Sequence, residues 1–183
     1  MSNNIFLTGK MNTGKTTIIK KVVAKLNLSP GGFMVDREQE GGHWYSFYLL
    51  PSHIFLNKNE NIKYFKKRGT FAWKDNDGEI NINPKVFDNY GSELLNKNPN
   101  KDLIIMDELG RFELRAYKFQ NKVIELLKSD KLVLGVIKPE KNVFLDKVRK
   151  ILDQKPLIVT KDNREDIYNY VLVEIKKWRI QND

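Results

Sequence analysis

Short apolar runs alternate along this sequence with longer stretches in which apolar residues recur at helical spacing. Four apolar runs predict strands, at 5–8, 103–106, 131–137 and 156–160. Four helix-period stretches predict helices, at 15–27, 115–128, 139–153 and 163–179. The alternation predicts an α/β fold in which helices flank a mostly parallel central sheet. We see no repeat and no linker, so we expect residues 1–183 to form a single domain.

The stretch between the first helix and the second half of the chain has a different pattern. Residues 29–32 (Ser-Pro-Gly-Gly) are expected to end the first helix. Two β-prone runs within 33–50 lie on either side of Gly41-Gly42 and predict a β-hairpin. The Asn- and Lys-rich residues 51–82 are expected to be irregular. The elements expected from there on are short strands at 69–73 and 79–82, followed by a helix from Pro84 to about Leu95.

The charge of the chain raises the question of a nucleic-acid partner. The sequence has 32 basic and 23 acidic residues, a formal net charge of +9. The lysines are spread along the whole chain, and the densest basic run, 63–69, is short. We therefore favour an interpretation in which these residues form solvated faces and some serve a polyanionic ligand such as a nucleotide. A nucleic-acid partner stays an open alternative.

The composition also bears on the compartment. No apolar run reaches the roughly 18–20 residues needed to span a bilayer, and the N-terminus lacks the features of a secretory signal. The chain has no cysteine, which excludes disulfides and a thiolate nucleophile and fits a reducing compartment. We therefore expect a cytoplasmic protein with no membrane partner. His43 and His53 are a weak basis for a zinc site.

The first predicted strand leads directly into the run GKMNTGKT, which matches the phosphate-binding pattern G-x4-G-K-[ST]. Its place between a strand and a helix is that of a P-loop, or Walker A motif, where backbone N–H groups and the helix dipole meet phosphate oxygens. Lys15 is expected to reach the β- and γ-phosphates, and the Thr16 hydroxyl to ligate Mg²⁺. The residues expected to bind the nucleotide are Gly9, Lys10, Met11, Asn12, Thr13, Gly14, Lys15, Thr16 and Thr17.

Three positions of this loop are expected to have unusual backbone conformations. Gly9 and Gly14 supply conformations that residues with a Cβ avoid. Many P-loops have another Gly where this chain has Asn12. Because Asn tolerates positive φ better than most residues, we expect this departure to be chemically mild.

A second motif follows the apolar run 103–106, where the sequence continues as Asp107-Glu108. A strand that ends in an acid is what a Walker B motif requires, so Asp107 is expected to hold Mg²⁺ together with Thr16. Glu108 adds a second carboxylate that can polarise a water molecule, which favours hydrolysis of a nucleotide. The alternative is that Glu108 is an exposed acid or pairs with Arg111.

Residues 105–114, IMDELGRFEL, resemble the Asp-Glu-Ile-Gly-Lys-Met-Glu-Leu signature of the Thep-type nucleoside triphosphatases, a family also called cancer-related NTPases. Segments 8–17, 31–42, 133–137 and 160–166 are similar to other pieces of that family, in the same order. The resemblance implies a P-loop fold related to those of nucleotide kinases and RecA-like ATPases. It also implies slow, Mg²⁺-dependent hydrolysis of several nucleoside triphosphates.

Several further residues are candidates for contacts with the γ-phosphate or the base. Phosphoryl transfer usually needs an added cation in the transition state, and the candidates are Arg111, Arg149 and Arg164. Arg111 is favoured by its position beside the Walker B motif. Asn163 and Arg164 follow the last predicted strand and are hypothetical contacts of the base. The aromatic residues of 44–47 and 71–73 are expected to be sheet core, with stacking on a base as the alternative.

We therefore predict a RecA-like P-loop enzyme that hydrolyses ATP, GTP or other nucleoside triphosphates to the diphosphate and phosphate. Its catalytic residues are predicted to be Lys15, Glu108 and Arg111. One alternative is a small-molecule or nucleotide kinase whose acceptor binds residues 43–82. The other is a nucleic-acid-associated NTPase.

Overall fold

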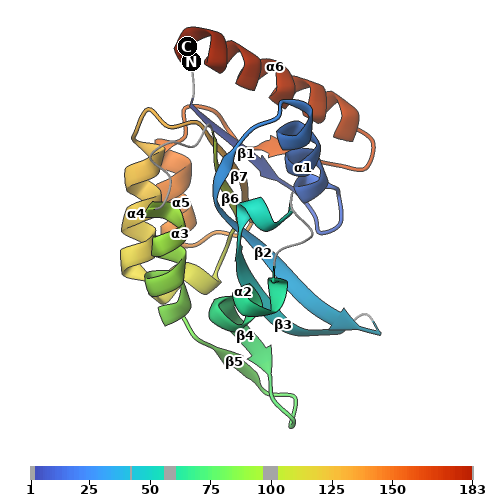
Figure 1. The fold of residues 1–183 in the computed structure, drawn as a ribbon, viewed down its shortest axis with the longest axis vertical. Helices are drawn as coiled ribbons and strands as arrows, with labels where there is room; N and C mark the ends of the chain where they lie inside the picture. The colour runs from blue at the N-terminus through green and yellow to red at the C-terminus, as the bar shows by residue number, and fades with distance from the viewer. Residues whose placement is uncertain (1–2, 42, 56–60, 97–102, 183) are drawn as a thin grey trace.

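The structure of the protein is a computed structural model that describes residues 3–41, 43–55, 61–96 and 103–182. Eight strands form one central sheet (Figure 1). The strands are β1 (Asn4–Thr8), β2 (Pro30–Glu40), β3 (His43–Pro51), β4 (Thr70–Lys74), β5 (Ile80–Ile82), β6 (Leu103–Leu109), β7 (Val133–Ile137) and β8 (Leu157–Ile158). The α-helices are α1 (Lys15–Lys25), α2 (Ile62–Gly69), α3 (Ser92–Asn96), α4 (Tyr117–Leu127), α5 (Val143–Ile151) and α6 (Arg164–Asn182). Single 3₁₀ or π turns are η1 (Ser52–Phe55), η2 (Phe87–Gly91) and η3 (Phe112–Arg115).

The order of the strands in the sheet is β5-β4-β3-β2-β6-β7-β1-β8. Strands β2, β6, β7, β1 and β8 pair in parallel, and β3, β4 and β5 extend the β2 edge as antiparallel strands. The predicted α/β fold, with a mostly parallel sheet and a hairpin after the first helix, is therefore confirmed. Of the predicted turn residues, Gly42 lies outside the described residues.

Two strands are longer than the sequence predicts, because the sheet pairs residues whose local pattern is ambiguous. Residues 30–32, expected only to end a helix, begin β2 and pair in parallel with β6. Gly32 permits this close approach, since its φ is +86° and a Cβ there would lie 2.1 Å from the carbonyl oxygen of Ile105. Strand β6 continues through Asp107 to Leu109, because both residues still pair with β7.

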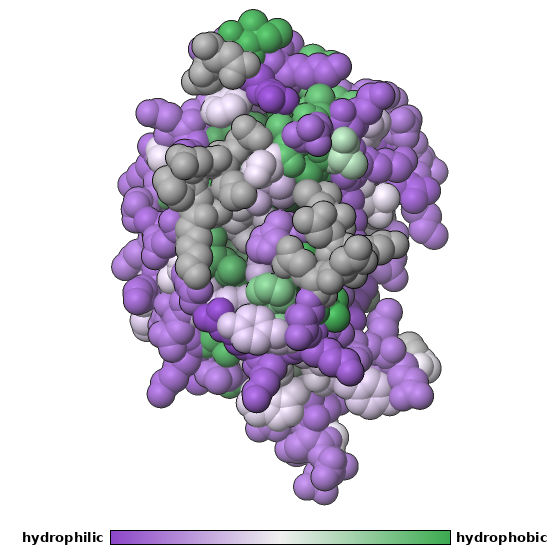
Figure 2. Space-filling view, in the orientation of Figure 1, coloured by the Kyte–Doolittle hydropathy of each residue, from purple (hydrophilic) through white to green (hydrophobic). Residues whose placement is uncertain are grey.

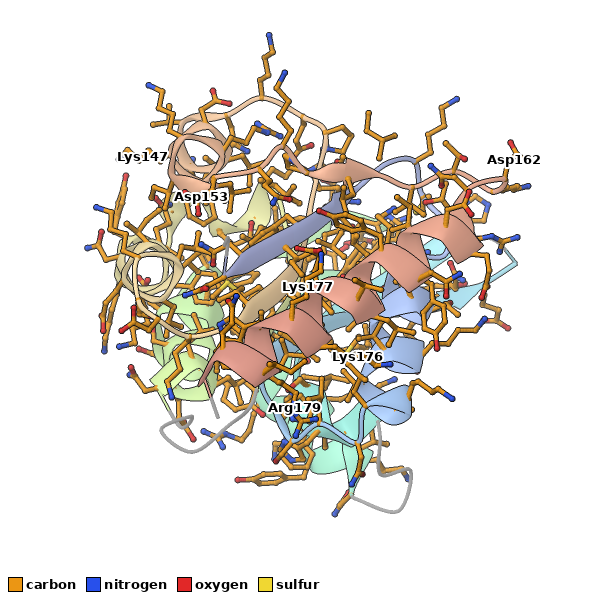
Figure 3. The ribbon with its side chains drawn as sticks, turned by 90° about the horizontal axis from the view of Figure 1, so that it is seen from above. Lys147, Asp153, Asp162, Lys176, Lys177 and Arg179 are labelled. Carbon is orange, nitrogen blue, oxygen red and sulfur yellow. The ribbon has the colours of Figure 1, made fainter. Side chains whose placement is uncertain are left out.

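Helices cover both faces of the sheet (Figure 1). Helices α3, α4 and α5 pack on one face, where Phe87, Phe119 and Phe144 are buried. Helices α1 and α6 pack on the other face, and Figure 3 shows α6 running obliquely over the strands beside α1, with Lys176, Lys177 and Arg179 along it. Within the described ranges, no helix combines the length and the apolar character that a bilayer crossing requires.

The segment predicted to be irregular contains a helix, α2, which packs against β3. The Asn61 side chain caps it by accepting a hydrogen bond from the backbone N–H of Tyr64 at 3.3 Å. The basic run 63–69 forms most of this helix, and two of its cations have acidic neighbours: Arg68 pairs with Glu93 at 2.8 Å, and Lys66 lies 3.9 Å from Asp36. Hydrophilic residues cover most of the face seen in Figure 2.

Candidate active site

The loop between β1 and α1 has the backbone geometry of a phosphate cradle. Gly9, Asn12 and Gly14 have φ of +132°, +61° and +100°, a region that residues other than Gly and Asn seldom adopt. A Cβ at Gly9 would lie 2.5 Å from the carbonyl oxygen of Val159, so packing also requires a glycine there. Asn12 has a positive φ, and the sequence analysis expected Asn to tolerate this conformation.

Lys15 lies at the base of this loop. Its side chain is buried, and Nζ donates hydrogen bonds to the carbonyl oxygens of Gly9 at 3.0 Å and Lys10 at 2.6 Å. Burial lowers the pKa of Lys15, and the nearby Glu108 opposes this effect. The ammonium group is thus held inside the loop by weak carbonyl acceptors, which phosphate oxygens can replace with stronger, charged ones.

Strand β6 and helix α1 bring Thr16 and Asp107 together. Thr16 Oγ1 donates a hydrogen bond to Asp107 Oδ2 at 2.8 Å. Asp107 is 3% exposed, and burial raises the pKa of its carboxyl group to about 7, although the bond from Thr16 acts in the opposite direction. A hydroxyl and a buried carboxylate in contact beside a phosphate loop fit Mg²⁺, which takes one or two protein oxygens besides water and phosphate ligands.

A zinc site has no such support. In the described part of the chain, no group of three or more His, Cys, Asp or Glu side chains is arranged to hold a metal ion. His43 begins β3 and His53 lies in η1, beyond the other end of that strand.

Glu108 pairs with a lysine, not with Arg111. Its Oε1 lies 2.8 Å from Nζ of Lys138, and both side chains are partly exposed. Lys138 directly follows β7, the strand between β1 and β6, and its backbone N–H donates to the carbonyl oxygen of Leu109 at 2.9 Å. Sequence reasoning missed Lys138, because its proximity to Glu108 depends on the order of strands in the sheet.

The three arginines considered from the sequence occupy different environments. Arg111 lines a cavity that the phosphate loop also lines, and its guanidinium lies 5.4 Å from the centre of the Phe112 ring. Arg149 donates to the carbonyl oxygens of Lys138 at 2.6 Å and Glu140 at 2.8 Å, and so holds the segment after β7 in place. Arg164 begins α6, where Nε donates to a backbone carbonyl and Cδ lies against Gly14. The three residues are thus not gathered at one point.

Asn163 is engaged within its own loop. Its Oδ1 accepts a hydrogen bond from the backbone N–H of Thr160 at 2.8 Å, and its Nδ2 donates to the carbonyl oxygen of Ile158 at 2.9 Å. Its carbonyl oxygen accepts the N–H of Ile167 at 3.0 Å, at the start of α6. Asn163 shapes the loop that follows β8, and contact with a base stays a prediction.

Arg37 on β2 reaches across to the tip of the phosphate loop, a contact that the sequence did not suggest. Its Nη2 donates a hydrogen bond to Asn12 Oδ1 at 3.1 Å, and its Nη1 lies 2.6 Å from the sulfur of Met11. A glycine at position 12 has no side-chain acceptor for this arginine. The Asn in place of a third loop glycine therefore gives the loop a cationic neighbour.

Glu113 is a second functional candidate that sequence reasoning missed. It is 2% exposed and lines the same cavity as the loop, and its Oε2 accepts the N–H of Gly110 at 2.9 Å. Burial raises the pKa of Glu113 to about 7, and the charges of Glu108 and Glu140 add to the effect. The signal in the sequence was the resemblance of the segment 105–114, whose last Glu is this residue.

We expect Glu113→Gln to flatten the pH dependence of stability. Because its folded-state pKa of about 7 exceeds the ordinary value of 4.5, the folded state binds more protons between these values, and stability falls as pH rises through that window. The variant keeps an acceptor for the N–H of Gly110 but cannot ionise. We expect the free energy of unfolding, measured with urea, to fall less between about pH 5 and about pH 8 in the variant than in the unmodified protein. The difference should be a few kcal/mol at most.

The matched control is Glu125→Gln, which removes an exposed carboxylate from α4. It should lose as much stability between the two pH values as the unmodified protein. Equal losses for Glu113→Gln and the unmodified protein would show that Glu113 is ionised in the folded state throughout this range.

These groups surround one cavity of about 620 Å³, a size typical of small-molecule sites. Its lining includes the phosphate loop and the first turn of α1, together with Asp107 and Glu108. The other lining side chains are charged or aromatic, and they include Arg37, Arg111, Lys138, Glu113, Glu140, Trp44, Phe47, Phe71 and Phe112.

An α/β sheet whose first strand leads through a G-x4-G-K-T loop into a helix, with a buried carboxylate facing the loop threonine, defines a P-loop nucleotide-binding protein. The model of the NTPase family matches residues 4–172, so the chain belongs to this family of nucleoside triphosphatases. The resemblance noted from the motifs is confirmed.

Similar proteins come from bacteria and archaea. A protein of Thermotoga sp. (strain RQ2) named nucleoside-triphosphatase THEP1 is 31% identical over 173 residues, which cover 94% of this chain and 95% of that protein. A protein of Methanocaldococcus jannaschii with the same name is 32% identical over 181 residues, covering 93% and 96%. The crystal structure of THEP1 from Aquifex aeolicus has 21% identity and a TM-score of 0.70, covers 94% of this chain and 98% of its own, and shares the fold.

Proposed function

We propose that this chain is a Mg²⁺-dependent nucleoside triphosphatase that converts a nucleoside triphosphate to the diphosphate and phosphate at the β1–α1 loop. The observation that supports the proposal most is the 2.8 Å hydrogen bond between Thr16 and Asp107, two side chains at the loop that could together bind Mg²⁺. Hydrolysis is also the activity in the names of the family and of the relatives.

Each residue of the loop region has a distinct part in the proposal. Backbone N–H groups of residues 9–17 and the Lys15 ammonium bind the β- and γ-phosphates. Thr16 and Asp107 would hold Mg²⁺, which when bound neutralises the charge on the β- and γ-phosphate oxygens. The low exposure of Asp107 favours this role, because a buried carboxylate is stabilised in its ionised form by a cation.

Glu108 orients the water molecule that attacks the γ-phosphorus and accepts its proton. Its partner Lys138, 2.8 Å away, restricts the position of the carboxylate. As the water oxygen bonds to phosphorus, the bond from phosphorus to the bridging oxygen breaks, and the diphosphate leaves. No residue of the chain is modified covalently in this scheme.

The cation at the γ-phosphate comes from Arg37 in our proposal, with Arg111 as the candidate indicated by the sequence. Both line the cavity, but of these two described residues Arg37 is the one that contacts the loop itself, through Asn12 and Met11. We expect Arg37→Ala to lower kcat by about 100-fold or more, since one transition-state donor typically has an effect of that size. Arg111→Ala, assayed in parallel, should lower it by less than about tenfold.

A double-mutant cycle that combines Arg37→Ala with Asn12→Gly tests whether Asn12 positions Arg37 or whether each substitution lowers activity independently. Glycine tolerates the positive φ at this position, so the change removes the Arg37 acceptor without straining the loop. The two substitutions should be non-additive in kcat, because each removes the same contact. Additive losses, or a larger loss from Arg111→Ala, would return the role to Arg111.

Other parts of the proposal concern the substrate and the compartment. We expect the base to extend toward the β8–α6 loop, where Arg164 lies against Gly14.

We place the protein in the cytoplasm, which the lack of cysteine supports. The names of the relatives favour hydrolysis over the kinase and nucleic-acid alternatives.

Phosphate release from ATP, GTP, CTP and UTP, measured with Mg²⁺ and with no acceptor or nucleic acid, tests the proposal. We expect release from several of the four and none when EDTA removes the metal. Release that requires added DNA or RNA and falls steeply with salt would favour the nucleic-acid-associated alternative.

A further inference from the structure

Lys138 lies at the edge of the sheet where the phosphate loop begins. Strand β7 runs between β1 and β6 and parallel to both, so the carboxyl ends of the three strands meet at this edge (Figure 1). Val136 of β7 is aligned with Leu7 of β1 and with Asp107 of β6. Lys138 comes two residues after Val136, as Gly9 comes two residues after Leu7. The sheet therefore places Lys138 between the loop and the Walker B acid.

The backbone of Lys138 is held in place on both sides. Its N–H donates to the carbonyl oxygen of Leu109 at 2.9 Å, and its carbonyl oxygen accepts a hydrogen bond from Nη2 of Arg149 at 2.6 Å. The stem of its side chain passes close to Gly110, where a Cβ would lie 3.3 Å from Cγ of Lys138. The side chain is 37% exposed and lines the cavity that the phosphate loop also lines. A fixed backbone thus presents the ammonium group to this cavity.

The charges of Lys15, Glu108 and Lys138 act on one another. Burial lowers the pKa of Lys15, the charge of Glu108 raises it, and the charge of Lys138 lowers it further. In the proposed mechanism Glu108 stands beside the γ-phosphate, and two anions at short range repel each other. A cation that contacts both of them offsets this repulsion. Lys138 is suited to that part, because its Nζ already lies 2.8 Å from Oε1 of Glu108.

We propose that Lys138 binds Glu108 and the γ-phosphate at the same time, and that this contact makes the site prefer a nucleoside triphosphate to a diphosphate. The inference rests on the proposed function for the position of the γ-phosphate and adds a specificity-determining residue. A lysine ammonium group has three N–H donors, and the contact with Glu108 requires one of them. Another donates to a γ-phosphate oxygen.

The contact distinguishes the substrate from the product. The loop amides and Lys15 hold the β-phosphate of both nucleotides, whereas the group that faces Lys138 is present in the triphosphate alone. The diphosphate therefore lacks one charge-assisted hydrogen bond and leaves more easily after hydrolysis. Arg37 remains the cation proposed for the transition state, and Lys138 acts on the bound triphosphate before the reaction.

The experiment must separate a contact with the phosphate from the pairing with Glu108. Lys138→Met alone removes the cation and also leaves the Glu108 carboxylate unpaired beside the γ-phosphate, so either change could weaken binding. We therefore make Lys138→Met in the Glu108→Gln background, where the carboxylate is absent and turnover is expected to be slow. Calorimetric titration gives the dissociation constants of ATP and ADP, each with Mg²⁺, for the single and the double variant.

We expect Lys138→Met in this background to weaken ATP binding by about tenfold or more, the size of one hydrogen bond to a charged group. ADP binding should change by less than about twofold. Lys138→Arg keeps the charge and should restore part of the preference for ATP, and Lys138→Gln serves if the Met variant folds poorly. The matched control is Lys141→Met, which removes the same charge from an exposed residue outside the described lining of the cavity.

Two outcomes would overturn the inference. An ATP affinity that Lys138→Met and Lys138→Gln leave unchanged in the Glu108→Gln background would confine the role of Lys138 to Glu108. Equal losses for ATP and ADP, or an equal loss of ATP binding in Lys141→Met, would mean that general attraction between charges accounts for the effect. Because the readout is binding, it is independent of turnover. A preference for ATP that depends on Lys138, without phosphate release by the unmodified protein, would contradict the proposed hydrolysis and support this inference.

Discussion

Glu108→Gln is expected to bind nucleotide as tightly as the unmodified protein while its turnover falls by about 100- to 1000-fold. Glutamine has nearly the shape of glutamate, and the loop residues that bind the phosphates are unchanged. It cannot accept the proton of the attacking water, so the effect should appear in kcat and not in the dissociation constant. Fluorescent-nucleotide titration and phosphate release measure the two quantities separately.

Two controls accompany this variant, because Glu108 also pairs with Lys138. Lys138→Met breaks the same ion pair but leaves the carboxylate, and should lose less activity than Glu108→Gln. Glu125→Gln removes an exposed carboxylate on α4 and should have no effect. Turnover of Glu108→Gln within about threefold of the unmodified protein would remove Glu108 from the mechanism.

Lys15→Ala should weaken binding of the triphosphate and abolish most hydrolysis. The ammonium group hydrogen bonds inside the loop, to the carbonyl oxygens of Gly9 and Lys10. Its loss removes a charge-assisted contact to the β- and γ-phosphates in both the ground state and the transition state. We expect kcat/KM to fall by about 1000-fold or more, with a raised KM.

Lys21→Ala is the matched control for Lys15→Ala. Lys21 lies on the same helix, but its side chain faces the Tyr168 ring at 5.6 Å and not the loop. It removes the same charge from the protein, so equal losses in the two variants would mean that general electrostatics, and not the loop contact, accounts for the effect. Thermal melting without nucleotide checks that both variants fold.

The parts of the fold that sequence predicted are those with a local signal. The run GKMNTGKT and the apolar strand before Asp107 are each contiguous, and the sheet places Thr16 against Asp107 as the motifs require. Helix α2 was missed because its Lys-rich sequence has little apolar character. In the structure the helix packs against β3, and this tertiary packing stabilises it.

The parts of the site that sequence did not indicate come from non-local contacts. Arg37 reaches Asn12 from β2, and Lys138 reaches Glu108 from the end of β7, so both contacts depend on the strand order β2-β6-β7-β1. No spacing along the chain encodes that order. The Arg111 pairing considered for Glu108 was wrong for the same reason, since a lysine 30 positions away lies nearer in space.

The central claim is that water attacks the γ-phosphorus at this site. Hydrolysis of Mg²⁺-ATP in water enriched in heavy oxygen, followed by mass spectrometry of both products, tests it most directly. We predict that each phosphate released in a single turnover carries one heavy oxygen and that the diphosphate carries none. Heavy oxygen in the diphosphate, or the same rate of labelled phosphate from Lys15→Ala, would contradict the account.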